Sequence, residues 1–225
     1  MILNMGLVVG TVHGKWTPAE AAPLVQDNGG EKAHGDFSYS SVVGMLLYLS
    51  GHSRPDIAYA VNCAARYMFC PRHSHEKALK RLDCYLKATR KRGLVLNPTS
   101  DTLKIDAYPD ANFAGMYGHK ENTNPAYVKS RSRYMITVAD CTDLWKSLLQ
   151  QMTAQSTMEA EIIVLAQSCK DLFPIMDIVK STAPVVGLPN PKTSMHVSIQ
   201  KDNAGELILA ELCRLNLILA ASITI

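Results

Sequence analysis

The sequence lacks the features that mark secreted and membrane-bound proteins. Its six cysteines form no C-x-x-C pair and no spacing typical of a disulfide scaffold, so we expect free thiols in a reducing compartment. No basic stretch followed by a long apolar run opens the chain, and the longest late apolar run, 215–225, is too short to span a bilayer. These absences predict an intracellular protein, cytoplasmic or nuclear, that is neither secreted nor in a membrane.

Charge is also scarce. Charged residues make up 19% of the 225 residues and the net charge is only +3, so the overall charge does not by itself favour a nucleic-acid partner. Hydrophobic residues reach 47%, an ordinary share for a globular protein that excludes general disorder. A chain of this length can form one large domain or two small ones with their own cores, and we expect two.

The residue pattern changes twice along the chain. Residues 1–35 are rich in Gly, Pro, Ala and Asn without a sustained period, which indicates a leader or linker. Residues 36–100 carry apolar residues at helical spacing, with a first helix that ends at Gly51 and a second that Pro55 opens. Residues 101–225 begin with strand-like alternation. The sequence therefore predicts a small helical subdomain followed by a second domain.

Most of the local positive charge lies between Arg66 and Arg92. A third helix, expected over about 74–89, places its leucines on one stripe and its basic residues away from that stripe. Two interpretations stay open: a merely solvated face, and a surface that follows a phosphate backbone. The candidate nucleic-acid-binding residues are Lys77, Lys80, Arg81, Lys87, Arg90 and Lys91.

The second domain alternates strands with helices. The expected strands are 103–108, 134–138, 144–148 and 195–199. A helix beginning at Ser156 is expected to end near Phe173 and Pro174, and an apolar helix is expected over 204–219. The core stripe of the first of these helices is expected to be Met158, Ile162, Leu165, Cys169 and Leu172. This order predicts an α/β fold with a mixed β-sheet and helices packed on its faces.

Three carboxylates stand at predicted junctions of this domain, about fifty and about forty residues apart. Asp110 lies near a strand end, Glu161 in the first turn of a helix, and Asp202 at a strand-to-helix turn. Two divalent cations about 3.5–4 Å apart can clamp a phosphodiester, but they need several carboxylates on rigid elements. The pattern is therefore typical of a two-metal nuclease.

Two of these acids have a neighbour that competes for the same role. Asp106 is the alternative to Asp110, and spacing alone does not separate them. Glu159 is the alternative to Glu161, but Ser156 and Glu159 form the S-x-x-E pattern of a capping box, which gives Glu159 a structural role at the helix start. Glu161 is left as the carboxylate without an assigned helical role.

Cys70, His73 and His75 offer metal donors at close spacing. Pro71 lies between the first two, and no second Cys or His pair lies nearby in the sequence. A solvated helix start is therefore a better interpretation of these residues than a zinc site.

A series of motifs, found in order over roughly 36–212, resembles the C-terminal part of a Ty1/copia-type retrotransposon Pol polyprotein, downstream of its reverse transcriptase palm. Many motifs in the same order are far more specific than any one of them. The segments that carry the resemblance are YSSVVGMLLYL at 39–49, RPDIAYAV at 54–61, YPDANFAG at 108–115, SRS at 130–132, WKS at 145–147, STMEAE at 156–161 and DNAG at 202–205.

The resemblance implies a ribonuclease H-like fold with a remnant of the reverse transcriptase thumb and connection region before it. It implies hydrolysis of the RNA strand of an RNA·DNA hybrid, with Mg²⁺ or Mn²⁺ held by Asp110, Glu161 and Asp202. The implied partners are a hybrid or other nucleic acid and the rest of a Pol polyprotein, in a virus-like particle or the nucleus. The alternative is a non-catalytic nucleic-acid-binding remnant that uses the basic helix.

The chain departs from the family pattern at several places. Asn112 replaces a second acid, and Arg133 stands where the family has a small residue, commonly Gly. The segment 214–225 replaces a Lys-His-Ile-Asp-like segment, which implies a C-terminal truncation and an incomplete catalytic set. No Tyr-x-Asp-Asp palm motif is present, which excludes polymerisation by this chain alone. Whether the chain is an enzyme stays open at this point.

Overall fold

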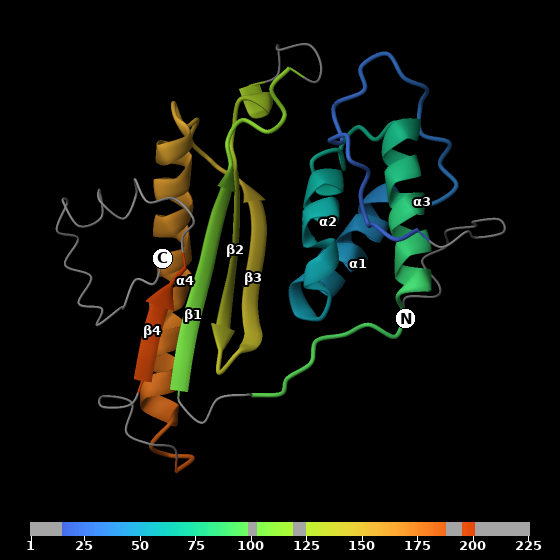
Figure 1. The fold of residues 1–225 in the computed structure, drawn as a ribbon. Coiled ribbons are helices and arrows are strands. Elements are labelled where there is room, and N and C mark those ends of the chain that lie inside the picture. Colours follow the sequence, from blue (N-terminus) through green and yellow to red (C-terminus); the bar gives the residue numbers. More distant parts are fainter. Residues whose placement is uncertain (1–14, 99–102, 119–124, 188–194, 201–225) are drawn as a thin grey trace. The chain divides into compact units, whose positions relative to one another are not determined.

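The computed structural model describes residues 15–98, 103–118, 125–187 and 195–200. The chain divides near Leu94 into two compact units, each with its own hydrophobic core (Figure 1). The first unit is helical and the second is built on a β-sheet.

The helices of the first unit are α1 (Tyr39–His52), α2 (Ala58–Ala65) and α3 (His73–Ala88), with the 3₁₀ turn η2 (Pro55–Ile57) before α2. The three helices expected from the sequence are confirmed, with α1 ending one residue beyond Gly51. Pro55 takes the first position of η2, where its missing N–H leaves no hydrogen bond unmade.

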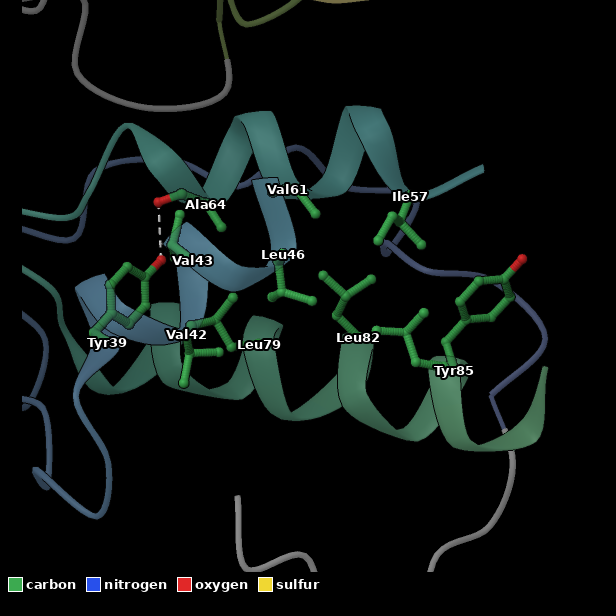
Figure 2. Close-up of a cluster of buried hydrophobic side chains, with 11 residues drawn as sticks. Tyr39, Val42, Val43, Leu46, Ile57, Val61, Ala64, Leu79, Leu82 and Tyr85 are labelled. Carbon is green, nitrogen blue, oxygen red and sulfur yellow. Dashed lines mark hydrogen bonds between the residues drawn. The ribbon is translucent and has the colours of Figure 1, made fainter. Parts of the chain in front are cut away.

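The core of this unit is drawn in Figure 2, where side chains of the three helices meet. Leu46 of α1, Val61 of α2 and Leu82 of α3 are all fully buried. The hydroxyl of Tyr39 donates a hydrogen bond to the Ala64 carbonyl at 3.0 Å, so this polar group is satisfied inside the apolar cluster. Burial of this kind stabilises short helices, since the helix propensity of their residues alone is too weak to keep them folded in water.

The segment before α1, expected as a leader or linker, is packed onto the helices in its described part. Leu24 and Phe37 lie against the core. The Tyr67 hydroxyl donates to the Leu24 carbonyl at 3.0 Å, and His75 Nε2 lies 3.1 Å from the Val25 carbonyl oxygen. This packing could not be predicted from the sequence, because the segment has no helical or strand period and is held by hydrogen bonds from side chains far along the chain.

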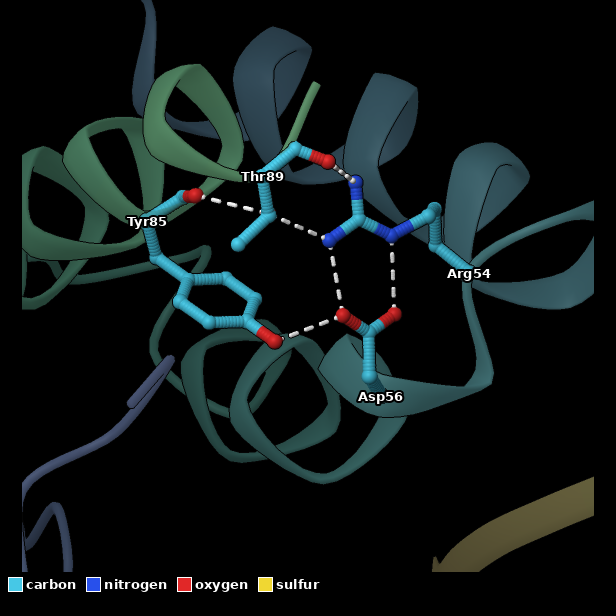
Figure 3. Close-up of polar contacts among 4 residues, drawn as sticks. All are labelled: Arg54, Asp56, Tyr85 and Thr89. Carbon is cyan, nitrogen blue, oxygen red and sulfur yellow. Dashed lines mark hydrogen bonds and ion pairs between the residues drawn. The ribbon is translucent and has the colours of Figure 1, made fainter. Parts of the chain in front are cut away.

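A polar network closes the C-terminal end of α3 (Figure 3). The Arg54 guanidinium donates to both oxygens of Asp56 (2.8 and 2.7 Å), and also to the Thr89 carbonyl (3.3 Å) and hydroxyl (2.7 Å). The Tyr85 hydroxyl donates to Asp56 at 2.7 Å. Arg54 thus satisfies a carbonyl at the helix end and places a positive charge at the negative end of the helix dipole.

The network also sets the charge state of Asp56. Partial burial by itself raises the pKa of this carboxyl, but the hydrogen bonds from Arg54 and Tyr85, together with the Arg54 charge, outweigh it, so the pKa lies below its usual range. Asp56 therefore remains ionised, and the side chain of Arg54 is buried with its counter-charge beside it.

The second unit contains a four-stranded sheet in the order β3-β2-β1-β4. Its elements are β1 (Leu103–Asn112), the turn η3 (Pro125–Tyr127), β2 (Arg131–Val138), β3 (Cys141–Leu149), α4 (Thr157–Thr182) and β4 (Met195–Ile199). β1 pairs antiparallel with β2 and parallel with β4, and β2 pairs antiparallel with β3. The expected strands and the antiparallel pairing are confirmed, and the first three strands are longer than expected.

Helix α4 packs against the sheet and covers one of its faces (Figure 1). Ile105 and Ala107 of β1 are fully buried there against Leu172 and Met176 of α4. The expected fold is confirmed: an α/β, ribonuclease H-like mixed sheet preceded by a small helical subdomain. The expected helix 204–219 lies outside the described residues.

The structure corrects two expectations about α4, the first in full and the second in part. The helix does not end near Phe173 but continues through Pro174 to Thr182. Proline removes one helical hydrogen bond, at a cost of about 3 kcal/mol, but the turns beyond it pack Met176 and Val179 against the sheet, and this burial offsets the loss.

The core stripe of α4 is as expected at Leu165, Cys169 and Leu172 but differs nearer the start of the helix. Met158 and Ile162 are more than a third exposed, while Ala160 and Val164 are fully buried. The apolar residues of this helix lie on several sides of it, so spacing alone did not decide which of them face the sheet.

Cys63, Cys70, Cys84, Cys141 and Cys169 are free thiols, as expected. Within the part of the chain that the structure describes, no helix combines the length and the apolar character that crossing a membrane requires.

Candidate functional site

Asp110 lies on β1 directly opposite Arg133 of β2. Its side chain is 47% exposed, and its Oδ2 lies 2.6 Å from Nη2 of Arg133. The carboxylate is therefore open to solvent but already paired with a cation. Arg133 is one of the residues that depart from the family pattern, and the structure shows what it contacts.

Glu161 was expected in the first turn of its helix and is the fifth residue of α4, one position beyond that turn. Its side chain is buried, with 9% of the residue exposed. Its Oε1 accepts a hydrogen bond from the backbone N–H of Ala111 at 3.1 Å. Because Ala111 follows Asp110 directly, this contact brings the second acid to the part of β1 that carries the first. Ala111 and Glu161 are fifty positions apart in the sequence.

The start of α4 explains Glu159 without catalysis. The Ser156 hydroxyl accepts a hydrogen bond from the Glu159 N–H at 3.1 Å, which is the expected N-cap. The Glu159 carboxylate accepts the N–H of Gln155 at 2.7 Å. It thus reaches back as predicted, but to the amide one residue before the cap rather than to that of Ser156.

Asp202 lies outside the described residues. The strand before it is described: Ile199 of β4 is the parallel register partner of Ala107, and the N–H of Gln200 donates to the Ala107 carbonyl at 2.8 Å. Parallel neighbours have their carboxyl ends at the same edge of a sheet. β1 and β4 therefore run toward the edge on which Asp110 lies.

Asp106, the alternative to Asp110, is fully buried inside the sheet. It accepts a hydrogen bond from the Ser198 hydroxyl of β4, and its Oδ2 lies 2.7 Å from the Lys104 ammonium. The hydrogen bond to Asp106 raises the pKa of Lys104. The Ser198 contact makes Asp106 a link between β1 and β4, and the Lys104 contact pairs its charge within β1. Asp110, in contrast, is open to solvent.

Two buried polar residues, which the sequence analysis did not name as candidate site residues, form hydrogen bonds around the two acids. Gln150, which is 1% exposed, donates through Nε2 to the Ala160 carbonyl (2.8 Å) and to the Ser132 hydroxyl (3.1 Å). The buried Ser130 hydroxyl accepts the N–H of Ala114 at 3.2 Å. Gln150 thus links β2 to Ala160, the residue before Glu161. No periodicity in the sequence singles it out, because it follows a strand as an ordinary polar residue.

The basic face of α3 is partly neutralised. Three of the six candidate residues are paired with carboxylates: Lys80 with Asp36 at 3.0 Å, Arg81 with Glu20 at 3.6 Å and Lys87 with Asp83 at 2.6 Å. The other three, Lys77, Arg90 and Lys91, are exposed. Two of the pairing acids come from the segment before α1, which the sequence did not place next to this helix.

A basic hollow lies beside the C-terminal end of α3. This pocket, the basic hollow, has a volume of about 310 Å³. Its aromatic and basic lining residues are Lys15, Trp16, Lys87, Arg90, Lys91 and Arg92. The indole of Trp16 is 88% exposed. Five cations around an open aromatic ring provide both phosphate contacts and a surface on which a base can stack.

No model of a known protein family and no solved structure matches the chain. Curated proteins do match it. The chain is 33% identical over 156 residues to the retrovirus-related Pol polyprotein from transposon RE2 of Arabidopsis thaliana, covering 69% of this chain and 10% of that protein. It is 34% identical over 135 residues to the retrovirus-related Pol polyprotein from transposon TNT 1-94 of Nicotiana tabacum, covering 60% of this chain and 9% of that protein.

A third relative has a different name. The chain is 31% identical over 133 residues to the secreted RxLR effector protein 161 of Plasmopara viticola, covering 59% of this chain and 87% of that protein. The chain thus spans about a tenth of each of the two Pol polyproteins and most of this shorter relative.

Proposed function

Because the chain belongs to the family of retrovirus-related Pol polyproteins of copia-type transposons, we propose that its second unit is a ribonuclease H domain that hydrolyses the RNA strand of an RNA·DNA hybrid. The observation that carries the proposal is the contact of Glu161 with the N–H of Ala111. It brings an acid of α4 beside the acid-bearing part of β1, on a ribonuclease H-like sheet.

The proposed metal ligands are Asp110, Glu161 and Asp202. Their chemistry fits the ion, because carboxylate oxygens are the ligands that Mg²⁺ and Mn²⁺ prefer. A count along the strands supports including Asp202: it stands three positions beyond Ile199, as Asp110 stands three positions beyond Ala107, the register partner of Ile199. When bound, the ions supply an activated water and a counter-charge for the leaving oxygen.

The residues of the chain have separate tasks in this proposal. Glu161 is held in orientation by the Ala111 N–H, and Gln150 fixes the turn of α4 from which it projects. Arg133 has to release Asp110 before that carboxylate can hold a cation. The hybrid itself is expected to be recognised by its shape, its phosphates and its 2′-hydroxyls rather than by base sequence.

The test is cleavage of a labelled RNA·DNA hybrid by the purified chain with Mg²⁺ or Mn²⁺. We expect metal-dependent cleavage of the RNA strand that is lost in Glu161→Gln and in Asp110→Asn. Asp143→Asn, which changes an exposed acid of β3, is the matched control and should cleave as the unmodified chain does. Absence of metal-dependent cleavage, or equal cleavage by Glu161→Gln, would sink the proposal.

A second candidate function, favoured by the basic hollow, is nucleic-acid binding by the first unit without catalysis. The cations of the hollow can contact successive phosphates while Trp16 stacks on a base. Binding of this kind should weaken steeply with added salt and should proceed without cleavage. Binding that salt does not affect would rule it out. In either case we propose that the remaining parts of a Pol polyprotein are the natural partners of the chain.

A further inference from the structure

Glu31, His34 and His73 converge in the first unit, although they come from two segments about forty residues apart. One ligand atom from each of these side chains lies within 4.8 Å of the other two. The rings of His34 and His73 have their centroids 4.2 Å apart, tilted by 59°. His73 is the first residue of α3, and the other two residues precede α1. The convergence therefore depends on the packing of that earlier segment onto α3.

This cluster differs from the zinc donors that the sequence suggested. His75 is buried and both of its ring nitrogens are engaged: Nδ1 accepts the N–H of Arg72 at 3.0 Å, and Nε2 donates to the Val25 carbonyl at 3.1 Å. Its ring also stacks on Tyr67. His75 is thus a structural residue, and Cys70 is exposed and outside the cluster. Only His73 of the original three remains a metal donor.

The main chain holds the donors in place before any ion binds. The N–H of His73 donates to the Glu31 carbonyl at 3.1 Å, and Lys32 forms an isolated antiparallel bridge with Arg72. The segment that carries His34 is thereby fastened to the start of α3. A preformed cluster loses less conformational entropy on binding an ion than a flexible one does.

Two further features point to a bound cation. His73 Nδ1 is buried and, among the described residues, has no hydrogen-bond partner. It lies 3.7 Å from Oε2 of Glu76, a buried carboxylate that accepts the N–H of His34 at 2.9 Å and that of Gly35 at 3.1 Å. Glu76 thus orients the backbone of one donor and places negative charge beside another, as residues behind metal ligands commonly do.

We propose that Glu31, His34 and His73 form a Zn²⁺ site. Two imidazoles and a carboxylate are a ligand set that suits zinc and not Mg²⁺, which prefers oxygen alone. Three protein ligands leave the fourth position to water. Glu31 and His34 are exposed, so an ion can reach the site from solvent. The bound ion fastens the segment before α1 to α3 through side chains, in addition to the backbone contacts. The proposal is independent of the ribonuclease H function proposed for the second unit.

The test is a calorimetric titration of the full chain with Zn²⁺ in the presence of excess Mg²⁺. We expect saturation at one equivalent, a higher midpoint of thermal unfolding with Zn²⁺, and, with Co²⁺ as a substitute, the visible absorption of a four-coordinate ion. His34→Gln and Glu31→Gln should each weaken binding about tenfold or more. Both residues are exposed, so circular dichroism should show that these variants fold normally.

His52→Gln and Cys70→Ser are the matched controls, because they remove an exposed histidine and an exposed thiol of the same unit outside the cluster. Both should bind Zn²⁺ as the unmodified chain does. The double variant Asp110→Asn with Glu161→Gln should also retain Zn²⁺ binding, which separates this site from the acids of the second unit. Absence of saturable binding, unchanged binding by His34→Gln, or loss of binding in the double variant would overturn the proposal.

Discussion

The guanidinium of Arg133 lies 2.6 Å from the carboxylate of Asp110, directly across the β1–β2 pair. Both side chains are about half exposed, and pairs of this kind contribute roughly 0.2–1 kcal/mol. A divalent cation that takes Asp110 as a ligand has to displace this partner. Since 1.4 kcal/mol corresponds to a factor of ten, the pair weakens metal binding by at most about fivefold. Arg133 therefore reduces the proposed activity without excluding it.

Replacing Arg133 by serine frees Asp110, so we expect Mg²⁺ or Mn²⁺ to bind more tightly, by up to about fivefold. The measurement is the metal concentration at half-maximal cleavage, or direct calorimetric titration. Lys146→Ser is the control, because Lys146 pairs with Asp171 at 2.6 Å and lies opposite Tyr134 rather than Arg133. Equal affinity for metal in Arg133→Ser and the unmodified chain would show that the ion pair does not compete with the metal.

Asp56→Asn should make the first unit less stable and less sensitive to acid. The pKa of Asp56 is lower in the folded chain than its usual value of about 4, so its contribution is present above about pH 4 and is lost as pH falls through the folded pKa. The substitution leaves the buried Arg54 without its counter-charge, at a cost of about 2–3 kcal/mol near neutral pH. Urea unfolding measured from about pH 3 to about pH 7, a range that includes the usual pKa of about 4, gives both the loss of stability and its dependence on pH.

Asp36→Asn is the control for this substitution. Asp36 is also paired, with Lys80 at 3.0 Å, but its side chain is 51% exposed and its charge is screened by water. Its replacement should change stability much less than that of Asp56. Equal losses in the two variants would mean that the network in Figure 3 has no special part in holding the helices together.

Gln150→Leu should destabilise the second unit by about 1–2 kcal/mol, because the Ala160 carbonyl and the Ser132 hydroxyl lose a buried donor. Thermal or urea unfolding is the measurement. Gln151→Leu changes the neighbouring exposed glutamine and should stay within about 0.5 kcal/mol. If Gln150 also positions Glu161, Gln150→Leu should reduce cleavage under conditions in which the chain remains folded.

Trp16→Ala should weaken the binding of a single-stranded oligonucleotide by about 1–3 kcal/mol while leaving the dependence on salt unchanged, since stacking releases no counterions. The double variant Arg90→Gln with Lys91→Gln should instead lower the slope of log K against log salt by about 1–2. Fluorescence anisotropy at several salt concentrations separates the two effects. Phe69→Ala, an equally exposed aromatic residue outside the hollow, should bind normally.

Local signals in the sequence predicted most elements of the fold. The apolar spacing located α1, α2 and α3, and Ser156 marked the start of α4. The end of α4 was missed because the rule that proline ends a helix is local, while the burial of Met176 that carries the helix past Pro174 is a tertiary effect.

The candidate functional residues were predictable only in part. The family resemblance indicated Asp110 and Glu161 as candidates, and the capping box explained Glu159 without catalysis. The structure adds that Glu161 contacts the residue after Asp110. Arg133 was recognisable as unusual, but its contact with Asp110 required the register of two strands. The approach of His34 to His73 had no local signal, since it depends on how a segment without periodicity packs onto a helix.

The buried carboxylate of Glu76 has a practical consequence for dissecting the chain. It accepts hydrogen bonds from the backbone N–H groups of His34 and Gly35. Leu24, from the same segment, lies against the helical core. An expressed piece that starts at Asp36 would leave this carboxylate without two donors and open an apolar surface to water. Such a piece should be poorly soluble and quickly digested by proteases, whereas one that starts before Leu24 should be suitable for work on the helical unit alone.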